Sequence, residues 1–401
     1  MSPVIGLDVA KGESKGQVFL AKGKPYGKTF SVIHTTSGLN QLNRLIQEIE
    51  ELAGATPTVI LESTGHYHAS ITQFLDEHNY VYILLNPLIA HEAKKSSSLR
   101  RVKTDSMDAY RLCELFYKED FEPYKKRSIR FLNLRSLTRQ HDAITKLCVQ
   151  TKLQFQALLD QVFPEYVGVF GALYSNVSLN TLLEFPTAQA VLSVSETHMA
   201  ERIKALCKSR SKRWAEERAQ QIMAAASRNP FRNALVESHV FSLQMLIKII
   251  LQYKEHLSNL EKQIDALAEE LEEYKIIQSI PGIGEKIAAT IISEIGDIDR
   301  FNHAKKLVAF VGVDPSVHSS GKFTATINRI TKHGSSRLRH ALYEAVSCGL
   351  RKSGCEKLKA FYAKKKDEGK PYKVIMVACI NKLVHWIYAL LTRKEPFLDL
   401  V

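Results

Sequence analysis

The chain has 401 residues, and this length predicts two or three domains rather than one. Hydrophobic residues make up 45% of it, which excludes a disordered chain, and no run of about 18 or more uninterrupted apolar residues predicts a membrane span. Lys and Arg exceed Asp and Glu by 55 − 42 = 13, a surplus that indicates a polyanionic partner such as nucleic acid.

The cysteines and the N-terminus indicate a reducing compartment. The first ten residues predict a strand and not a secretory signal. Six scattered cysteines without a CxxC pair predict neither a zinc site nor a disulfide framework, so we expect a reducing cytoplasm. The cysteines are Cys113, Cys148, Cys207, Cys348, Cys355 and Cys379.

The first 125 residues alternate strand and helix patterns. Three strands come first, followed by helix, strand, helix, strand and helix. This is the element order of an RNase H-like α/β domain, in which helices cover a mixed sheet. The predicted strands are 3–9, 17–21, 28–35, 58–61 and 80–85, and the predicted helices are 39–52, 68–78 and 90–117.

Four acidic residues in this domain stand in unusual places. Asp8 lies inside the first apolar strand, and Glu62 directly follows the fourth. A charge in such a place costs several kcal/mol unless it is paired. The first and fourth strands of an RNase H-like sheet are neighbours, so these two carboxylates can converge, while Asp105 and Asp108 share one face at a helix start. Taken singly, each acid has a plainer interpretation as a turn or helix cap. Together they predict a site for Mg²⁺ or Mn²⁺, which prefer oxygen ligands and promote phosphodiester displacement.

Residues 126–275 predict a helical middle region. Residues 131–159 form one long helix candidate, and short helices are expected between 163 and 230. A second long helix carries an apolar seam with steps of three and four, which predicts either an intermolecular coiled coil or an intrachain hairpin with 131–159. The seam consists of Leu243, Leu246, Ile250, Tyr253, Leu257, Leu260, Ile264, Leu267, Leu271 and Tyr274.

Basic residues cluster in three runs, around 125–139, 208–213 and 329–339. One run alone is typical of a solvated helix face, but three in one chain favour phosphate binding. The candidate nucleic-acid contacts are Lys126, Arg127, Arg130, Arg135, Lys212, Arg213, Lys322, Arg329, Lys332, Arg337 and Arg339.

Residues 276–401 predict a mainly helical C-terminal domain, with a loop or short hairpin around 313–328 and helices from about 336 and 372. The segment Ile280-Pro281-Gly282-Ile283-Gly284 is typical of a helix-hairpin-helix turn. Gly282 and Gly284 would let a phosphate approach the start of the next helix, although a simple interhelix turn has the same pattern. The Ser/Gly-rich loop holds Ser319 and Ser320, whose composition alone suits an ordinary turn.

Several motifs resemble those of the DEDD transposases of insertion sequences, also called bridge recombinases. The N-terminal motifs are Gly6-Leu7-Asp8-Val9-Ala10-Lys11, Glu62-Ser63-Thr64-Gly65 and Lys103-Thr104-Asp105-Ser106-Met107-Asp108-Ala109. The C-terminal motifs are Gly312-Val313-Asp314-Pro315, Ser320-Gly321 and Ile330-Thr331-Lys332-His333-Gly334-Ser335-Ser336-Arg337-Leu338-Arg339. Ser335-Ser336 departs from the Gly-Asn or Gly-Asp that is usual in that family.

The resemblance implies a fold, a mechanism and partners. The N-terminal domain is expected to be similar to the RuvC junction resolvase, with Asp8, Glu62, Asp105 and Asp108 as the metal-binding tetrad. Ser320 is the implied nucleophile, with Ser319 as the alternative, and it would form a covalent phosphoserine intermediate. The family also implies a guide RNA and a site composed across protomers of a dimer or a dimer of dimers.

Three functions therefore compete at this point. The first is a DNA transposase or site-specific recombinase with a serine nucleophile. The second is a RuvC-like structure-selective endonuclease that uses metal-activated water and forms no covalent adduct. The third is a non-catalytic nucleic-acid-binding scaffold whose acidic residues are structural. Substituting Ser320 separates the first two, and Asp8→Asn tests the third.

Overall fold

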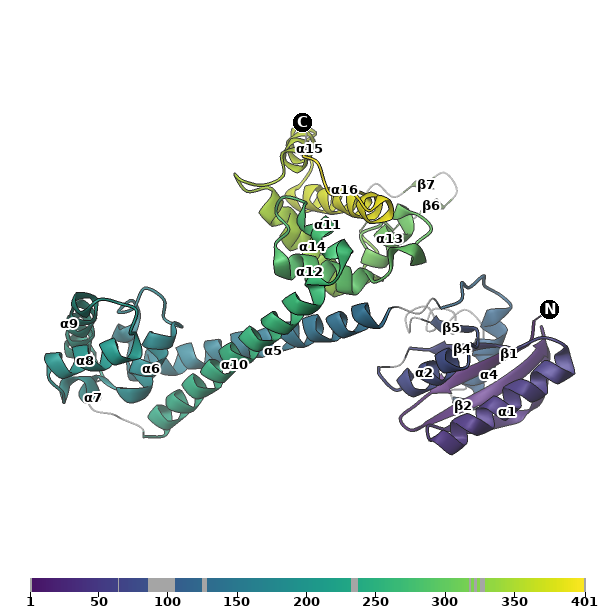
Figure 1. Ribbon diagram of the computed structural model, residues 1–401, viewed down its shortest axis with the longest axis horizontal. Coiled ribbons are helices and arrows are strands. Elements are labelled where there is room, and N and C mark those ends of the chain that lie inside the picture. Colours follow the sequence, from purple (N-terminus) through teal and green to yellow (C-terminus); the bar gives the residue numbers. More distant parts are fainter. Residues whose placement is uncertain are drawn as a thin grey trace. The chain divides into compact units, whose positions relative to one another are not determined.

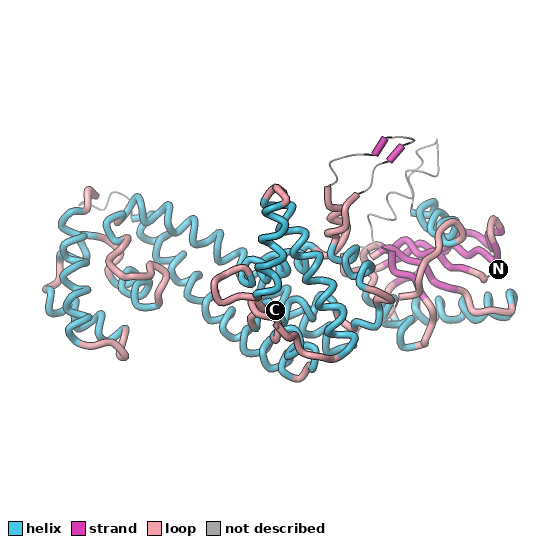
Figure 2. Tube along the Cα trace, turned by 90° about the horizontal axis from the view of Figure 1, so that it is seen from above, coloured by secondary structure: helices cyan, strands magenta, loops and turns pink. Residues whose placement is uncertain are grey.

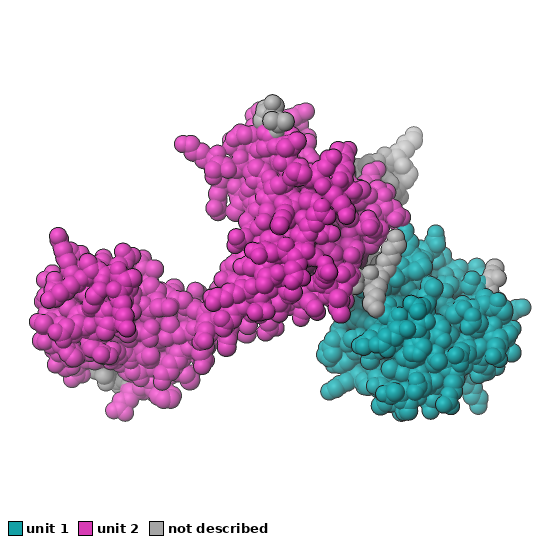
Figure 3. Space-filling model, in the orientation of Figure 1, with its two compact units in different colours: residues 1–127 teal, residues 128–401 magenta. Residues whose placement is uncertain are grey.

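The computed structural model describes residues 2–63, 65–85, 105–124, 128–231, 237–316, 319–320, 323–324 and 329–399. For Asp105, Ser319, Ser320, Phe323 and Thr324, the description covers the backbone. The chain divides into two compact units, residues 1–127 and residues 128–401 (Figure 3). The strands of the large sheet gather in unit 1, while helices make up most of the described part of unit 2 (Figure 2).

Unit 1 contains a five-stranded mixed sheet with the strand order β3-β2-β1-β4-β5 (Figure 1). The first three strands are antiparallel, whereas β4 runs parallel to both β1 and β5. The prediction that the first and fourth strands are neighbours is confirmed. The strands are β1 (Val4–Val9), β2 (Glu13–Ala21), β3 (Lys24–Ile33), β4 (Thr58–Glu62) and β5 (Tyr82–Leu85).

The β2–β3 hairpin is longer than predicted. β2 begins at Glu13 instead of 17, and β3 begins at Lys24 instead of 28. Ala21 pairs with Lys24 across a tight turn in which Gly23 has a φ of 71°, a conformation that glycine adopts at little cost. Most of β3 is exposed, so its polar residues gave no apolar alternation from which to read the strand.

Helices cover both faces of the sheet. On one face, Ile5 and Leu7 pack with Ile46 of α1 (Thr36–Ala53) and Ile71 of α2 (Ala69–Glu77). On the other face, residues of β1 and β4 such as Val4 and Ile60 pack with α4 (Asp105–Phe116). Both central strands are therefore nearly continuous apolar runs, as expected for strands that are buried on both faces. Of the predicted helix at 90–117, the part before 105 lies outside the described residues.

Unit 2 is organised around two long helices, α5 (Ile129–Val162) and α10 (Glu237–Glu269). They lie side by side and run antiparallel, because the start of α5 packs against the end of α10 and the end of α5 against its start (Figure 1). The apolar seam of α10 is buried at Leu243, Leu246, Ile250 and Ile264, and it is half-buried in the stretch from Tyr253 to Leu260. The seam thus packs against α5 of the same chain, the intrachain alternative, while an intermolecular coil stays a prediction.

The end of α5 and the start of α10 share a separate hydrophobic core, which we call the far core. In it, Phe155 and Leu159 of α5 and Leu243 of α10 pack against four short helices. Short helices were predicted for this segment, and they are confirmed. Each begins at a Ser or Thr whose hydroxyl accepts a backbone N–H of the first turn, the usual N-cap. The short helices are α6 (Asn176–Glu184), α7 (Ala188–Leu192), α8 (Glu196–Leu206) and α9 (Lys212–Arg228).

The near end holds a third core, shared by the C-terminal helices with both long helices. Phe131 and Leu134 of α5, together with Ile264 and Ala268 of α10, belong to it. The C-terminal helices are α11 (Glu272–Gln278), α12 (Glu285–Ile295), α13 (Ala304–Val311), α14 (Ser336–Gly349), α15 (Glu356–Asp367) and α16 (Tyr372–Arg393). Between α13 and α14 lie the two-residue strands β6 (Ser319–Ser320) and β7 (Phe323–Thr324).

The last helix, α16, is strongly apolar. Within the described ranges it is the one helix that is long and apolar enough to cross a membrane by length and composition. Its apolar residues, including Cys379, Leu383 and Ile387, are buried in the third core. Packing inside unit 2 therefore accounts for the composition of α16.

Candidate active site and nucleic-acid contacts

Asp8 and Glu62 occupy matching positions on neighbouring strands. β1 and β4 run parallel with Leu7 opposite Leu61, so the next residues, Asp8 and Glu62, lie side by side at the carboxyl ends of the two strands. Strand alternation turns both toward the face covered by α4, since Gly6 on that face contacts α4. The two carboxylates that were predicted to converge thus start from adjacent backbone positions, about 4.8 Å apart as in any sheet.

Helix α4 comes unusually close to this face. A Cβ on Gly6 would lie 2.4 Å from the carbonyl oxygen of Ala109, so a residue with a side chain would displace the helix. The Gly6 N–H donates to the Cys113 Sγ at 3.1 Å, and the thiol in turn donates to the Gln17 carbonyl at 3.2 Å. Burial raises the pKa of Cys113 to about 12, which keeps it a neutral thiol. Asp108 directly precedes Ala109 and is only 6% exposed, so it is held at this contact.

Asp108 also has a cationic neighbour on its own helix. Its Oδ1 lies 3.4 Å from Nη1 of Arg111, and both side chains are largely buried. Asp105 begins α4, and its spacing of three residues places it on the same helix face as Asp108. Its side chain lies outside the described part of the structure.

The donor chemistry of the acidic residues fits a hard divalent cation. Asp8, Glu62 and Asp108 offer carboxylate oxygens, the ligands that Mg²⁺ and Mn²⁺ prefer. Among the side chains that the structure describes, no group of three or more His, Cys, Asp or Glu stands within range of one metal ion. Asp105, the fourth predicted ligand, is not among them, so the tetrad as a whole stays a prediction.

The predicted serine lies in a short hairpin of unit 2. Ser319 pairs with Thr324 and Ser320 with Phe323, which places the backbone of Ser320 directly before the Gly321-Lys322 pair. The predicted short hairpin in this segment is confirmed. Lys322, a predicted nucleic-acid contact, lies outside the described residues.

Two backbone segments, 312–316 and 329–332, form what we call the hairpin base, because they lead into and out of the serine hairpin. Pro315 and Ile330 form an antiparallel bridge, and Ser316 donates its N–H to the Arg329 carbonyl at 2.7 Å. The Thr331 hydroxyl donates to the Asp314 carboxylate at 2.6 Å. These contacts fix the two segments of the hairpin base to each other.

Two glycines join the hairpin base to the neighbouring helices. A Cβ on Gly334 would lie 1.9 Å from the Phe310 carbonyl oxygen, and Gly312 has a φ of 74° beside it. Arg339 of α14 donates from Nη1 to the Val311 carbonyl at 2.8 Å, and burial lowers the pKa of Arg339. Arg339, predicted to contact nucleic acid, thus has an internal hydrogen-bond partner.

The other basic residues of the third run differ in their surroundings. Arg329 is exposed at the hairpin base, and Lys332, with a φ of 57°, donates its N–H to the Gly312 carbonyl. Arg337 approaches Asp142 of α5 at 3.4 Å. This pair lies beside a groove of about 610 Å³ among α5, α12 and α14.

The glycines of the predicted helix-hairpin-helix turn have separate roles. Gly282 has a φ of 98°, and a Cβ there would lie 2.5 Å from the Gly349 Cα, so Gly282 is needed for packing against the end of α14. Gly284 precedes α12 as its N-cap and faces open space. Of the two, Gly284 is the one whose surroundings leave room for a phosphate.

The first basic run is divided between the surface and the interior. Lys126 and Arg127 lie outside the described residues, and Arg130 is exposed near the start of α5. Arg135 instead donates from Nη2 to the buried carboxylate of Glu294 on α12 at 3.2 Å, and Arg139 pairs with the same group. Arg135 thus has an internal ion-pair partner that the sequence did not reveal, and its nucleic-acid contact stays a prediction.

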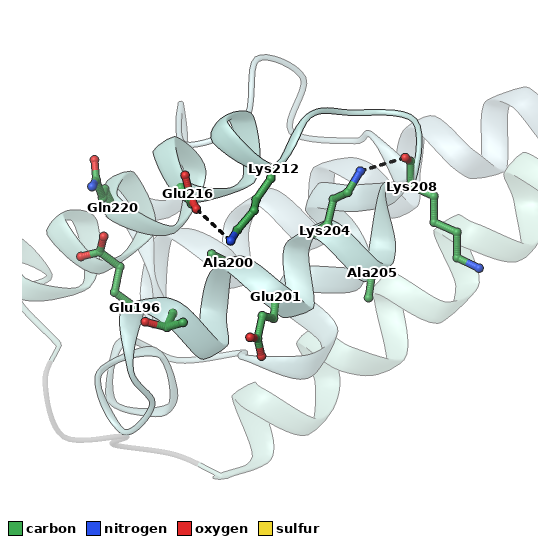
Figure 4. Close-up of a pocket in the computed structure, with 10 residues that line it drawn as sticks. Glu196, Ala200, Glu201, Lys204, Ala205, Lys208, Lys212, Glu216 and Gln220 are labelled. Carbon is green, nitrogen blue, oxygen red and sulfur yellow. Dashed lines mark hydrogen bonds and ion pairs between the residues drawn. The ribbon is translucent and has the colours of Figure 1, made fainter.

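The second basic run lies at the start of α9, along a groove of about 670 Å³ between α8 and α9 (Figure 4). Lys212 and Arg213 have side chains that are 85% and 89% exposed, with surface ion pairs to Glu216 and Glu217. Lys204 holds the preceding turn by donating to the Lys208 carbonyl at 3.0 Å. Exposed pairs of this kind are weak, so Lys212 and Arg213 stay available to a phosphate backbone.

Sequence reasoning missed Glu294. It stands in the apolar run Ile291-Ile292-Ser293-Glu294-Ile295, and its side chain is 1% exposed. A charged residue inside an apolar run was the signal that singled out Asp8, and the same signal was present here. Burial by itself raises the pKa of Glu294, but the hydrogen bond from Arg139 and the charges of Arg135 and Arg139 outweigh burial and lower it overall.

Two family models match the two ends of the chain. A model for transposases of the DEDD IS110 type matches residues 5–164, and a model described as the transposase IS116/IS110/IS902 family matches residues 274–363. The chain belongs to the IS116/IS110/IS902 family of transposases. This IS110-type transposase is accordingly an enzyme that acts on DNA as a transposase or recombinase.

Its relatives include both transposases and gene-inverting proteins. The transposase for insertion sequence element IS1111A of Coxiella burnetii is 33% identical over 39% of this chain and 43% of its own length. The pilin gene-inverting protein of Moraxella bovis is 23% identical over 98% of this chain and 97% of its own length. The mini-circle putative transposase for IS117 of Streptomyces coelicolor is 23% identical over 90% of this chain and 87% of its own length. The IS110-type transposase thus spans under half of the first of these relatives and nearly the whole of the second.

Proposed function

We propose that this transposase cleaves and rejoins DNA at the ends of an insertion sequence, with Ser320 as the nucleophile and a divalent cation bound by Asp8, Glu62, Asp105 and Asp108. The observation that carries the proposal is the placement of Asp8 and Glu62 at adjacent carboxyl ends of two parallel strands. Buried apolar strands that end in paired carboxylates suit a metal site better than a purely structural role.

The sheet of unit 1 supports a RuvC-like, RNase H-like domain as part of this proposal. Three antiparallel strands followed by two parallel ones, in the order β3-β2-β1-β4-β5, agree with that fold. Helix α4 covers the face on which Asp8 and Glu62 lie and carries Asp105 and Asp108 at its start. This arrangement supports a common site for the four acids on one face of unit 1.

The chemistry is an exchange of one phosphodiester for another. The Ser320 hydroxyl oxygen forms a bond to phosphorus while the bond from phosphorus to a deoxyribose oxygen breaks; the serine proton leaves to a base, and the deoxyribose oxygen takes up a proton. Attack by a deoxyribose hydroxyl on the phosphoserine reverses these steps, joins the strands and frees Ser320. A bound Mg²⁺ or Mn²⁺ would stabilise charge on the phosphate and lower the pKa of the hydroxyl.

The hairpin base supports Ser320 as the nucleophile. The contact between Thr331 and Asp314 and the bridge between Pro315 and Ile330 hold the two segments of the hairpin base together. Fixed ends limit the positions that a short hairpin can take, which favours attack geometry. Arg329, exposed at the hairpin base, supplies positive charge for the phosphate.

The proposal includes a guide RNA and an assembly of two or four protomers. A surplus of 13 positive charges and the exposed Lys212 and Arg213 suit a nucleic-acid backbone, RNA as well as DNA. A site composed of unit 1 from one protomer and the serine hairpin from another is consistent with their location in separate units. The name of the Moraxella bovis relative adds inversion of a DNA segment to the reactions to be tested.

A trapping assay tests the proposal. Purified protein, Mg²⁺ and RNA co-purified from the source cells are incubated with labelled DNA spanning the element junction, and covalent protein–DNA adducts are resolved on a denaturing gel. We expect an adduct with the native protein and none with Ser320→Ala. Ser319→Ala serves as the matched control and retains the adduct, whereas omission of the RNA abolishes it.

Other outcomes assign other functions. Cleavage without an adduct, unchanged by Ser320→Ala, would establish a RuvC-like endonuclease that uses water. An adduct that follows Ser319 would move the nucleophile by one residue. Cleavage that survives Asp8→Asn would remove the metal-binding role of the acidic residues.

A further inference from the structure

Glu294 connects three helices through one buried carboxylate. Arg139 of α5 donates from Nε to Oε1 at 2.7 Å and from Nη2 to Oε2 at 3.0 Å, a two-point ion pair. Arg135, one turn earlier on α5, adds a third donor, and the hydroxyl of Ser335 adds a fourth at 3.1 Å. We call Glu294, Arg135, Arg139 and Ser335 the Glu294 cluster. It joins α5, α12 and the start of α14 (Figure 1).

Ser335 is the member of the cluster that leads toward the serine hairpin. Its Oγ donates to Glu294 and accepts the Leu338 N–H at 3.2 Å, so the same hydroxyl forms the N-cap of α14. Because an ionised carboxylate only accepts, the hydroxyl proton of Ser335 points toward Glu294 and its lone pair toward the helix. The charge of Glu294 thereby fixes the direction of the cap.

Hydrogen bonds connect Ser335 to the hairpin base. Ser335 donates its N–H to the Phe310 carbonyl at 2.9 Å, and Gly334 packs against that same carbonyl. Next comes the hairpin base, where Lys332 and Thr331 donate to the carbonyls of Gly312 and Asp314. A shift at Ser335 therefore reaches both segments of the hairpin base.

A second contact ties the start of α14 to the same stretch of α5. Arg337, two residues beyond Ser335, pairs with Asp142, which also binds Lys146 at 2.8 Å. On the same stretch of α5, Thr138 forms a buried hydrogen bond of 3.1 Å with Ser293 of α12. The start of α14 is thus bound to one face of α5 rather than merely packed in the apolar core.

A contribution to stability alone does not explain why charged residues form the Glu294 cluster. A buried ion pair loses much of its attraction to desolvation, and apolar residues of similar size often give equal or greater stability. What such a pair does impose is a defined geometry between the elements that it joins.

We propose that Glu294 and Ser335 are positioning residues that set the serine hairpin at a fixed position against helix α5, so that the rate of strand cleavage depends on them although neither touches DNA. This rests on the proposed function in one respect, the identity of Ser320 as nucleophile. The positional effect itself concerns only the hairpin base and is measurable without any reaction.

The experiment compares four proteins in the full-length chain: the native protein, Ser335→Ala, Ser335→Thr and Ser175→Ala. Ser175 is a matched control because its hydroxyl is also an N-cap, accepting the Ser178 N–H at 3.3 Å, but it caps α6 in the far core. Glu294→Gln is a fifth protein, which tests the role of the carboxylate charge. Three quantities are measured: amide hydrogen exchange, the first-order rate of adduct formation at saturating DNA, and DNA affinity.

For Ser335→Ala we expect amide exchange to accelerate about tenfold at Ser316, Thr331 and Lys332, with the exchange in α16 unchanged, a factor that corresponds to ~1.4 kcal/mol. We expect adduct formation to slow by about the same factor while DNA affinity stays the same. Ser335→Thr, which keeps the hydroxyl, is expected to show the native exchange and the native rate of adduct formation. Ser175→Ala is expected to change neither quantity.

Unchanged exchange and unchanged adduct rate in Ser335→Ala would overturn the proposal. Faster exchange throughout unit 2, including α16, would also overturn it by reducing the Glu294 cluster to a general contribution to stability. If the native protein forms no adduct, the proposed nucleophile fails, and the exchange pattern alone still decides whether the Glu294 cluster positions the hairpin base.

Discussion

Gly6 of β1 lies so close to Ala109 of α4 that a Cβ on Gly6 would stand 2.4 Å from the Ala109 carbonyl oxygen. Gly6→Ala therefore forces α4 away from the sheet, and overpacking of this kind costs about 1–3 kcal/mol. Because α4 carries Asp105 and Asp108, we expect the rate of DNA cleavage to fall by more than the loss of folded protein alone would cause. Thermal unfolding and the cleavage assay measure the two effects. Gly171→Ala, where the added Cβ meets nothing within 4 Å, is the control and leaves both unchanged.

Asp8→Asn should abolish stabilisation by Mg²⁺. If Asp8 and Glu62 bind a cation, saturating Mg²⁺ at about 100 times its dissociation constant stabilises the folded protein by about 2.7 kcal/mol. The variant is expected to lose this shift. Thermal unfolding with and without Mg²⁺ is the measurement, with the exposed Glu51→Gln as control. An equal Mg²⁺ shift in all three proteins would contradict a metal site at Asp8.

Arg213→Ala and Arg135→Met should separate surface cations from interior ones. Arg213 is exposed, so its loss is expected to leave stability unchanged and to reduce the salt dependence of nucleic-acid binding by about 0.7–0.9, the value for one phosphate contact. Arg135 pairs with buried Glu294, so its loss should cost about 1.5–3 kcal/mol and leave the salt dependence unchanged. Binding titrations at several salt concentrations and urea unfolding provide the data. A reduced salt dependence of nucleic-acid binding in Arg135→Met would identify Arg135 as a nucleic-acid contact.

Acid should remove the stabilising effect of Glu294. Its pKa is lowered from the ordinary 4.5, so the folded state binds this proton less readily than the unfolded chain does. The stabilisation is fully present above pH 4.5 and is lost as the pH falls through the lowered pKa of the folded state. The difference in free energy of unfolding between the native protein and Glu294→Gln should therefore be constant near neutral pH and shrink below 4.5. Urea unfolding across this range measures it, and a difference that grows on acidification would contradict the lowered pKa.

Sequence patterns were sufficient for the parts of the fold in which local chemistry and burial agree. The central strands β1 and β4 are apolar runs with one misplaced acid each, so both their existence and their adjacency were predictable. The short helices between α5 and α10 are indicated in the sequence by the Ser and Thr residues that cap their N-termini. The exposed β3 lacks alternation, and its extent was accordingly underestimated.

The candidate site was predictable only where a residue conflicts with its neighbours in the chain. Asp8 conflicts with its strand, and the conflict pointed to a site. Arg135 and Arg339 conflict with nothing nearby, because the groups they bind, Glu294 and the Val311 carbonyl, come from other helices. Gly282 is required by contact with Gly349, far along the chain. Such long-range partners leave no local pattern.

The ion pair between Arg139 and Glu294 also orders events during synthesis of the chain. The two residues are 155 positions apart, so at 5–20 residues per second Arg139 leaves the ribosome on the order of ten seconds before its partner exists. During that interval the apolar start of α5, including Phe131 and Leu134, has no core to enter, since that core is completed by α12, α14 and α16. Unit 1 can fold as soon as it emerges, whereas the serine hairpin acquires its support only once nearly the whole chain has been made. A truncated product of translation would therefore carry the acidic face without a correctly held nucleophile.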